Sequence, residues 1–136
     1  MGGILDLETG ILKLCNAGHN PPILIYPDGQ VSYLEFKTQI FVGVVEDFKY
    51  SDEEVVLEKE SKLFLYTDGV TEAENINKEL YGEEKLLEML SDNASSDVRT
   101  TVNVVVDSIA SHVKEAEASD DLTILLIQYE PGTANS

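Results

Sequence analysis

Short apolar runs separated by turn residues fill the first half of the chain, which is typical of β-strands. The strands that this pattern predicts are Ile4–Leu7, Ile11–Cys15, Ile23–Tyr26, Val31–Phe36 and Tyr50–Glu58. Turns containing glycine, at Glu8-Thr9-Gly10 and Pro27-Asp28-Gly29, join the first four strands into two hairpins. We therefore expect antiparallel strands over residues 3–67.

The strongest strand signal is Leu63–Tyr66, four consecutive apolar residues. A half-exposed strand would alternate, so this run predicts a strand buried on both faces. Asp68 follows it after one residue, Thr67, and Thr71 with Glu74 has the spacing of a capping box, which predicts a helix beginning at Thr71. Asp68 would then lie between strand and helix, where its carboxylate can face a cleft. The alternative is a turn aspartate that bonds its own backbone.

A second acidic group precedes the last apolar run, Leu122–Ile127. If this run forms a strand antiparallel to the one at 62–67, Asp68 lies beside Asp120 and Asp121. Carboxylates gathered in this way repel each other, so they need a cation or raised pKa values at pH 7. Mg²⁺ and Mn²⁺ suit such all-oxygen sites. A solvated turn before the last strand is the alternative, and the residues themselves leave both open.

Two helical patterns lie between these acidic motifs. The first begins at Gly82-Glu83-Glu84, and the second is an amphipathic helix near 96–116 with Ser95 or Ser96 as its cap. Because Val and Ile are mediocre helix formers, the second helix depends on packing its apolar stripe against a sheet. Strands followed by segregated helices predict an α+β fold, an antiparallel β-sheet or sandwich covered by helices.

Charge narrows the classes of partner. With 9 basic and 26 acidic residues the formal charge is −17, which argues against nucleic acid and against contact with an anionic membrane. The negative charge also disfavours the binding of a phosphorylated substrate, unless bound metal ions make the local electrostatic potential positive. The single cysteine, Cys15, excludes an internal disulfide and fits a reducing cytoplasm. No apolar run reaches membrane-spanning length.

Three motifs in order carry a family resemblance: Asn16–Pro22 (Asn-Ala-Gly-His-Asn-Pro-Pro), Tyr66–Ala73 (Tyr-Thr-Asp-Gly-Val-Thr-Glu-Ala) and Asp120–Thr123 (Asp-Asp-Leu-Thr). In order and spacing they resemble the signatures of the protein phosphatase 2C-like (PPM) metallophosphatases, in the bacterial sporulation stage II protein E and sigma-factor-regulator branch. The similarity runs from about Gly3 to Tyr129. It implies part of a β-sandwich flanked by helix layers.

The resemblance also implies roles for individual residues. Asp68 and Asp120 match metal ligands, for Mn²⁺ or Mg²⁺, and the complete domain would hold two such ions. A metal-activated water would attack phosphorus, so no side chain of this chain is expected to act as a catalytic nucleophile. The supporting residues that match the family pattern are Asp121, Gly69, Thr67 and Gly43.

His19 has several interpretations. It could be an acid, a metal ligand or a phosphate donor, but a single imidazole without a spaced partner is a poor metal signal. We interpret the Gly-His-Asn-Pro turn as structural, with His19 or Asn20 bonding the loop backbone.

One feature of the family is missing. An Asp-Val-Ser-Gly-His-Gly-like motif, whose aspartate bridges the two metals, is not present in the sequence. We therefore expect residues 3–130 to be the C-terminal part of a phosphatase domain, with a partial metal site, and residues 131–136 to be a disordered tail. A partial domain would leave sheet edges exposed. We therefore expect these edges to pair with the missing part of the domain, or with a second copy of the chain in a homodimer.

The function that the resemblance implies is hydrolysis of phosphoserine or phosphothreonine on a sigma-factor regulatory protein. The substrate would be a phosphorylated anti-anti-sigma-type protein, an upstream sensor domain would control activity, and this segment alone would be inactive. The alternative is a non-catalytic interaction or dimerisation module, which the missing aspartate favours. A calcium-stabilised β-module is a weaker alternative, since no Asp-x-Asp-x-Asp-Gly loop is present.

Overall fold

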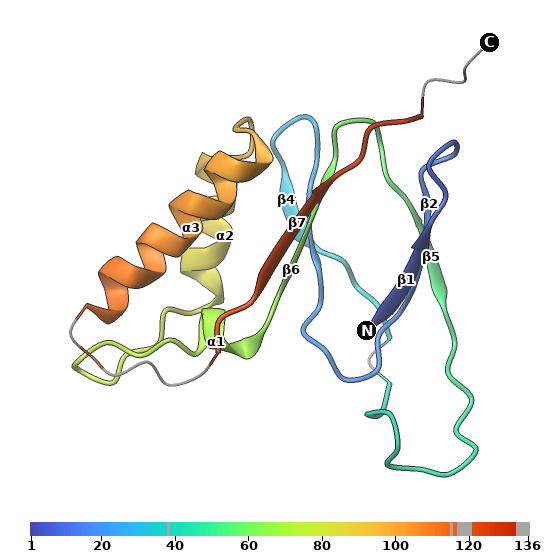
Figure 1. The fold of residues 1–136 in the computed structure, drawn as a ribbon, viewed down its shortest axis with the longest axis horizontal. Helices are drawn as coiled ribbons and strands as arrows, with labels where there is room; N and C mark the ends of the chain where they lie inside the picture. Colours follow the sequence, from blue (N-terminus) through green and yellow to red (C-terminus); the bar gives the residue numbers. More distant parts are fainter. Residues whose placement is uncertain (38, 115, 117–120, 133–136) are drawn as a thin grey trace.

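The computed structural model describes residues 1–37, 39–114, 116 and 121–132. It shows the expected α+β fold: two antiparallel sheets, with helices on the outer face of one of them (Figure 1). The strands are β1 (Gly2–Leu5), β2 (Ile11–Cys15), β3 (Ile23–Ile25), β4 (Val31–Tyr33), β5 (Glu53–Val56), β6 (Lys62–Tyr66) and β7 (Ile124–Gln128). The helices are α1 (Asp68–Thr71), α2 (Glu83–Asp92) and α3 (Val98–Val113). Among the described residues, no helix is long and apolar enough to cross a membrane.

The sheets have the orders β1-β2-β5 and β4-β3-β6-β7. The predicted pairing of the last strand with the central one is confirmed, because β7 lies antiparallel to β6 with Tyr66 opposite Ile124. The end of β6 therefore lies beside the start of β7, at the edge of the sheet that carries Asp68 and Asp121.

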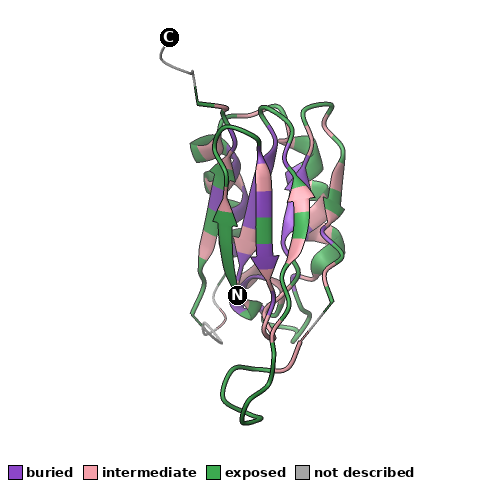
Figure 2. Ribbon diagram, turned by 90° about the vertical axis from the view of Figure 1, so that its right-hand side faces the viewer, coloured by how far each residue is buried: buried purple, intermediate pink, exposed green. Residues whose placement is uncertain are grey.

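β6 is buried on both faces, as its unbroken apolar run predicts. Phe64, with no exposed surface, packs toward the helices beside Val105 and Leu86. Leu63 packs between the two sheets with Leu12 and Leu24. Figure 2 shows the buried residues along the strands and the exposed loops at their ends. β6 thus contributes to both hydrophobic cores, and its packing fixes the position of Thr67 and Asp68, which follow it.

Both predicted helix starts at capping residues are wrong. α1 begins at Asp68 with Thr67 as N-cap, so Thr71 is its last residue and caps nothing. The N-cap of α3 is Asp97 rather than Ser95 or Ser96. Asp97 accepts from the Thr100 N–H at 3.0 Å and from the Thr100 hydroxyl at 2.6 Å. A carboxylate that accepts two hydrogen bonds is the stronger cap.

A buried lysine was not expected from the sequence. Lys62 is only 5% exposed, and its Nζ donates to the Ala94 carbonyl at 2.7 Å and to the Ser96 carbonyl. Burial lowers the pKa of Lys62. The amine ties β6 to the connection between α2 and α3, which holds the helices against the sheet.

The cap of α3 predicts a pH dependence. The hydrogen bonds from Thr100 hold the pKa of Asp97 below its ordinary value of 3.8. A carboxyl whose pKa is lowered by folding adds stability above its unfolded pKa, and this stability is lost as pH falls through the folded pKa. We expect Asp97→Ala to lower the urea midpoint at pH 7, and the gap from wild type to narrow below a pH of about 4.

Asp97→Asn is the matched control for this prediction, because it keeps an acceptor for Thr100 and removes the titration. The urea midpoint of Asp97→Asn should be close to that of wild type at pH 7. Because this variant has no carboxyl to protonate at position 97, its midpoint should fall less than that of wild type in acid. A gap between wild type and Asp97→Ala that is equally wide at neutral and acid pH would contradict the assignment.

Candidate metal centre

Thr67 joins the end of β6 to the segment before β7. Its N–H donates to the Thr123 carbonyl at 3.1 Å, and the Thr123 N–H donates to Thr67 Oγ1 at 3.1 Å. The Thr67 hydroxyl in turn donates to the Asp121 carbonyl at 3.2 Å. These bonds extend the β6–β7 pairing by one position and hold the two acidic segments together.

Gly69 allows the closest approach at this junction. A Cβ on Gly69 would lie 2.4 Å from the carbonyl oxygen of Asp121 and 3.0 Å from its carbon, which no side chain tolerates. The first turn of α1 is therefore packed directly against the Asp121 backbone. This contact places Asp68 and Asp121 at the same edge of the sheet, and both residues are exposed there.

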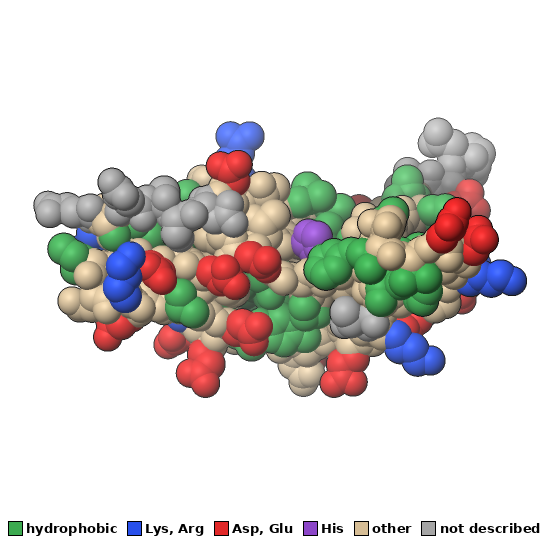
Figure 3. Space-filling view, turned by 90° about the horizontal axis from the view of Figure 1, so that it is seen from below, with side chains coloured by type: hydrophobic (Ala, Val, Ile, Leu, Met, Phe, Trp, Pro, Cys, Tyr) green, Lys and Arg blue, Asp and Glu red, His purple; other side chains and the backbone are tan. Residues whose placement is uncertain are grey.

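The donors at this edge are carboxylate oxygens, the ligands that Mn²⁺ and Mg²⁺ prefer. Asp120, the second expected ligand, lies outside the described residues. Within the described residues, no group of three or more His, Cys, Asp or Glu side chains could hold a metal. Viewed from this end, acidic side chains gather around α1 (Figure 3). The chemistry of the donors fits a hard divalent ion, but the described residues supply only part of its coordination.

Tyr66, the last residue of β6, belongs to the hydrophobic core beneath this edge. It is 3% exposed, and burial raises its pKa. Its phenol therefore stays neutral beside Asp68 and adds no charge to the site.

The Asn-Ala-Gly-His turn lies beside the same junction. The His19 N–H donates to Asn16 Oδ1 and Asn16 Nδ2 donates to the His19 carbonyl, both at 2.8 Å. His19 Nδ1 lies 3.2 Å from the Asn20 carbonyl. These bonds agree with the structural interpretation of the turn. The sequence alone did not assign a role to Asn16, which is 3% exposed and holds the turn closed. Its position three residues before His19 is typical of an asparagine whose side chain bonds the backbone of a turn.

Gly43 lies in the exposed loop between β4 and β5 rather than at the β6–β7 junction. Nothing lies within 4 Å of the position its Cβ would occupy, so space does not require glycine there. Its φ of +88° does, since this is the left-handed region. Its supporting role stays a prediction.

A mostly apolar cleft of about 390 Å³ opens between the two sheets. Side chains of β1, β2, β6 and β7 line it, and His19, Thr67 and Thr123 lie at its end near the acidic edge. β1 and β7 are edge strands of their sheets, and on β7 Leu125 remains 51% exposed and Ile127 39%. The two sheets therefore leave apolar surface of β7 uncovered within the described part of the chain.

The comparison with known families decides the relationship. A family model described as stage II sporulation protein E (SpoIIE) matches residues 1–130. The chain belongs to this family. Protein IcfG of Synechocystis sp. is 27% identical over 125 residues, 92% of this chain and 19% of that protein. Phosphoserine phosphatase RsbP of Bacillus subtilis is 28% identical over 127 residues, 93% of this chain and 29% of that protein.

Solved structures of the same kind share the fold. The RsbU and RsbW domains of Rv1364c from Mycobacterium tuberculosis superpose with a TM-score of 0.74 at 24% identity, covering 96% of this chain and 36% of that one. The SiaA-PP2C domain of Pseudomonas aeruginosa gives 0.74 at 23%, covering 90% and 48%. The phosphatase domain of SpoIIE from Bacillus subtilis gives 0.72 at 14%, covering 97% and 56%. The chain thus has the PP2C-type fold and spans less than two thirds of each relative.

Proposed function

We propose that the protein carrying this chain is a metal-dependent protein-serine/threonine phosphatase. Membership of the SpoIIE family over residues 1–130 supports this, as does the similarity to a protein named phosphoserine phosphatase RsbP. The observation that carries the proposal is the β6–β7 junction, where Thr67 and Gly69 hold the backbone on either side of Asp68 against that of Asp121. Exposed carboxylates at the end of a rigid, doubly buried strand are suited to hold a hard metal ion.

Each residue at the junction has a role in this proposal. Asp68 and Asp120 hold Mn²⁺ or Mg²⁺, and Asp121 orients the site. Thr67 and Gly69 keep the two segments in register, and Gly43 supports the loop nearby. When bound, a pair of such ions supplies an acidified water and neutralises phosphoryl oxygens. The chain's own contribution is to position the carboxylates.

The chain would form the C-terminal part of the phosphatase domain, residues 3–130. The sequence has no motif for the bridging aspartate, and the described residues hold no group of three metal-ligating side chains. The open cleft between the sheets and the exposed Leu125 and Ile127 support a further segment that covers them. The same observations favour the second candidate, a non-catalytic interaction or dimerisation module. Residues 133–136 of the expected tail lie outside the described residues, whereas Gly132 donates to the Leu7 carbonyl at 3.1 Å.

The proposed substrate is a phosphorylated anti-anti-sigma-type protein in the cytoplasm, with an upstream sensor domain controlling its hydrolysis. One solved relative contains RsbU and RsbW domains in a single protein. The chain covers 19% and 29% of the two curated relatives, which leaves length in each for the rest of the phosphatase domain and for a further domain.

Metal binding tests the site directly. We expect the chain to bind Mn²⁺ weakly, and Asp68→Asn and Asp120→Asn each to remove binding detectable from the electron paramagnetic resonance of free Mn²⁺. A carboxamide oxygen is a weaker ligand for a hard cation than a carboxylate, while the exposed position of Asp68 spares the fold. Glu88→Gln, an exposed acid on α2, is the matched control. Unchanged binding in the double variant would mean that the two acids are only turn residues.

A further inference from the structure

Residues 40–48, between β4 and β5, form the most exposed apolar segment of the described chain. The exposed fractions are 64% for Phe41, 77% for Val42 and 67% for Val44. Val45 is 51% exposed and Phe48 37%. Figure 2 shows this loop projecting from the lower end of the fold. Contiguous exposed apolar side chains mark a surface that another molecule or a further segment of the protein covers.

The loop is anchored at its base. Gln39 donates to the Ser51 carbonyl at 2.6 Å and accepts from the Ser51 N–H at 2.8 Å. The Tyr50 hydroxyl donates to the Phe41 carbonyl at 3.1 Å, and the Tyr50 ring packs edge-on against Phe48 with centroids 4.8 Å apart. A surface held in this way loses less conformational entropy on binding than a free loop.

The loop contacts the Asn16–His19 turn, which leads to the acidic edge. The Phe41 ring lies on Gly18, where an added Cβ would come within 2.4 Å of it. The next residue, His19, lines the cleft together with Thr67 and Thr123 of the β6–β7 junction. In the view from below, a histidine lies between the acidic side chains around α1 and the hydrophobic side chains of the loop (Figure 3). A protein positioned over the acidic edge would therefore meet this loop.

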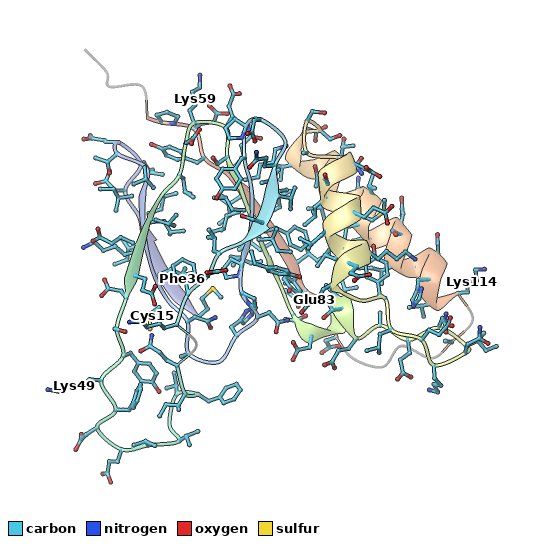
Figure 4. The ribbon with its side chains drawn as sticks, turned by 180° about the vertical axis from the view of Figure 1, so that it is seen from behind. Cys15, Phe36, Lys49, Lys59, Glu83 and Lys114 are labelled. Carbon is cyan, nitrogen blue, oxygen red and sulfur yellow. The ribbon has the colours of Figure 1, made fainter. Side chains whose placement is uncertain are left out.

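Charge explains why such a surface is needed. The chain carries −17, and a phosphoserine adds about −1.5 to −2, so electrostatics outside the metal ions repels the substrate. Residues 39–45 contain no charged side chain, in a sequence in which 26% of residues are charged. The uncharged stretch is followed by Glu46 and Asp47, and Lys49 points away from the fold (Figure 4).

We propose that the loop 40–48 is the docking surface for the phosphoserine-carrying protein, which contributes an apolar patch bordered by basic residues. This inference rests on the proposed function and deepens it. The apolar contact supplies affinity that the acidic site cannot, and the basic border of the partner complements Glu46 and Asp47. The loop recognises the folded protein rather than the phosphate group.

Binding without turnover tests the proposal with the chain itself. The probes are an anti-anti-sigma-type protein phosphorylated on serine and the same protein without the phosphate. The Kd of each for the chain is measured by calorimetry in EDTA. We expect both forms to bind. The double variant Val42→Ser with Val44→Ser should weaken the binding of each form about tenfold in Kd, as expected for two truncated interface side chains. Ile76→Ser is the matched control, because Ile76 is 75% exposed on the connection between α1 and α2. It should leave Kd unchanged.

The failures are distinguishable. Absence of binding by the wild-type chain, or equal Kd values for wild type and the double variant, would overturn the docking proposal. A variant that changes only the sedimentation of the chain would assign the loop to a second copy and also overturn it. Neither result depends on metal, so the phosphatase proposal is judged separately by Mn²⁺ binding and turnover. Equal urea midpoints for the variants establish that the fold is retained.

Discussion

The 136-residue chain alone is expected to show no Mn²⁺-dependent phosphatase activity, on a phosphoserine protein or on a small aryl phosphate. The physical reason is the incomplete donor set. A two-metal hydrolase needs both ions fixed, and in the proposed site this chain would supply Asp68 and Asp120 but no bridging aspartate. Asp6, an early acid, accepts from Glu8 and Thr9 in the β1–β2 turn and is not available for that role.

The complete domain should be active, and Asp68→Ala in it should lower Mn²⁺-dependent turnover about a thousandfold. Metal-ion catalysis is worth several kcal/mol, and each ~1.4 kcal/mol is tenfold in rate. Glu72→Ala is the matched control, since Glu72 is an exposed acid at the other end of α1. Its activity should stay within about twofold of wild type, because it provides no ligand in the proposed site.

Two results would count against this assignment. Metal-dependent turnover of phosphoprotein by the short chain would mean that the site is built from other residues or across a dimer. Equal activity of the Asp68→Ala and wild-type complete domains would mean that this carboxylate only caps a turn.

Gly69→Ala is expected to destabilise the chain by about 2 kcal/mol and to remove Mn²⁺ binding. Overpacking typically costs about 1–3 kcal/mol, whereas alanine gains up to about 1 kcal/mol over glycine in a helix interior. Here the added Cβ meets a backbone oxygen at 2.4 Å. A backbone atom cannot rotate away as a side chain can, so the start of α1 and the segment of Asp121 must separate.

Urea denaturation and Mn²⁺ titration measure the two effects. Gly2→Ala is the matched control, because nothing lies within 4 Å of the position of its Cβ. It should match wild type in both measurements. A Gly69→Ala chain as stable as wild type would show that the junction can relax, and that its packing does not position the two acids.

The strands and the shared core follow from the local pattern of the sequence. Leu63–Tyr66 is apolar without interruption, and only a strand covered on both faces accommodates such a run. The segments that carry Asp68 and Asp121 then lie side by side once the two strands pair antiparallel, a pairing that the sequence also predicted. Family membership could be inferred from three short motifs in order, because each lies at a strand end or turn where backbone geometry restricts the residue.

The details of the site depended on contacts between residues far apart in the chain. The capping box at Thr71 fits local rules, but α1 begins at Asp68, next to a close contact of Gly69 with Asp121 that no local pattern reveals. By residue type, Lys62 is expected at the surface. In the folded chain it is buried, because its amine donates to the carbonyls of Ala94 and Ser96. The sequence by itself thus determined the strands, the fold class and the family. Only the tertiary structure decided where α1 begins and which backbone groups hold the acids in place, because those choices depend on close packing between distant segments.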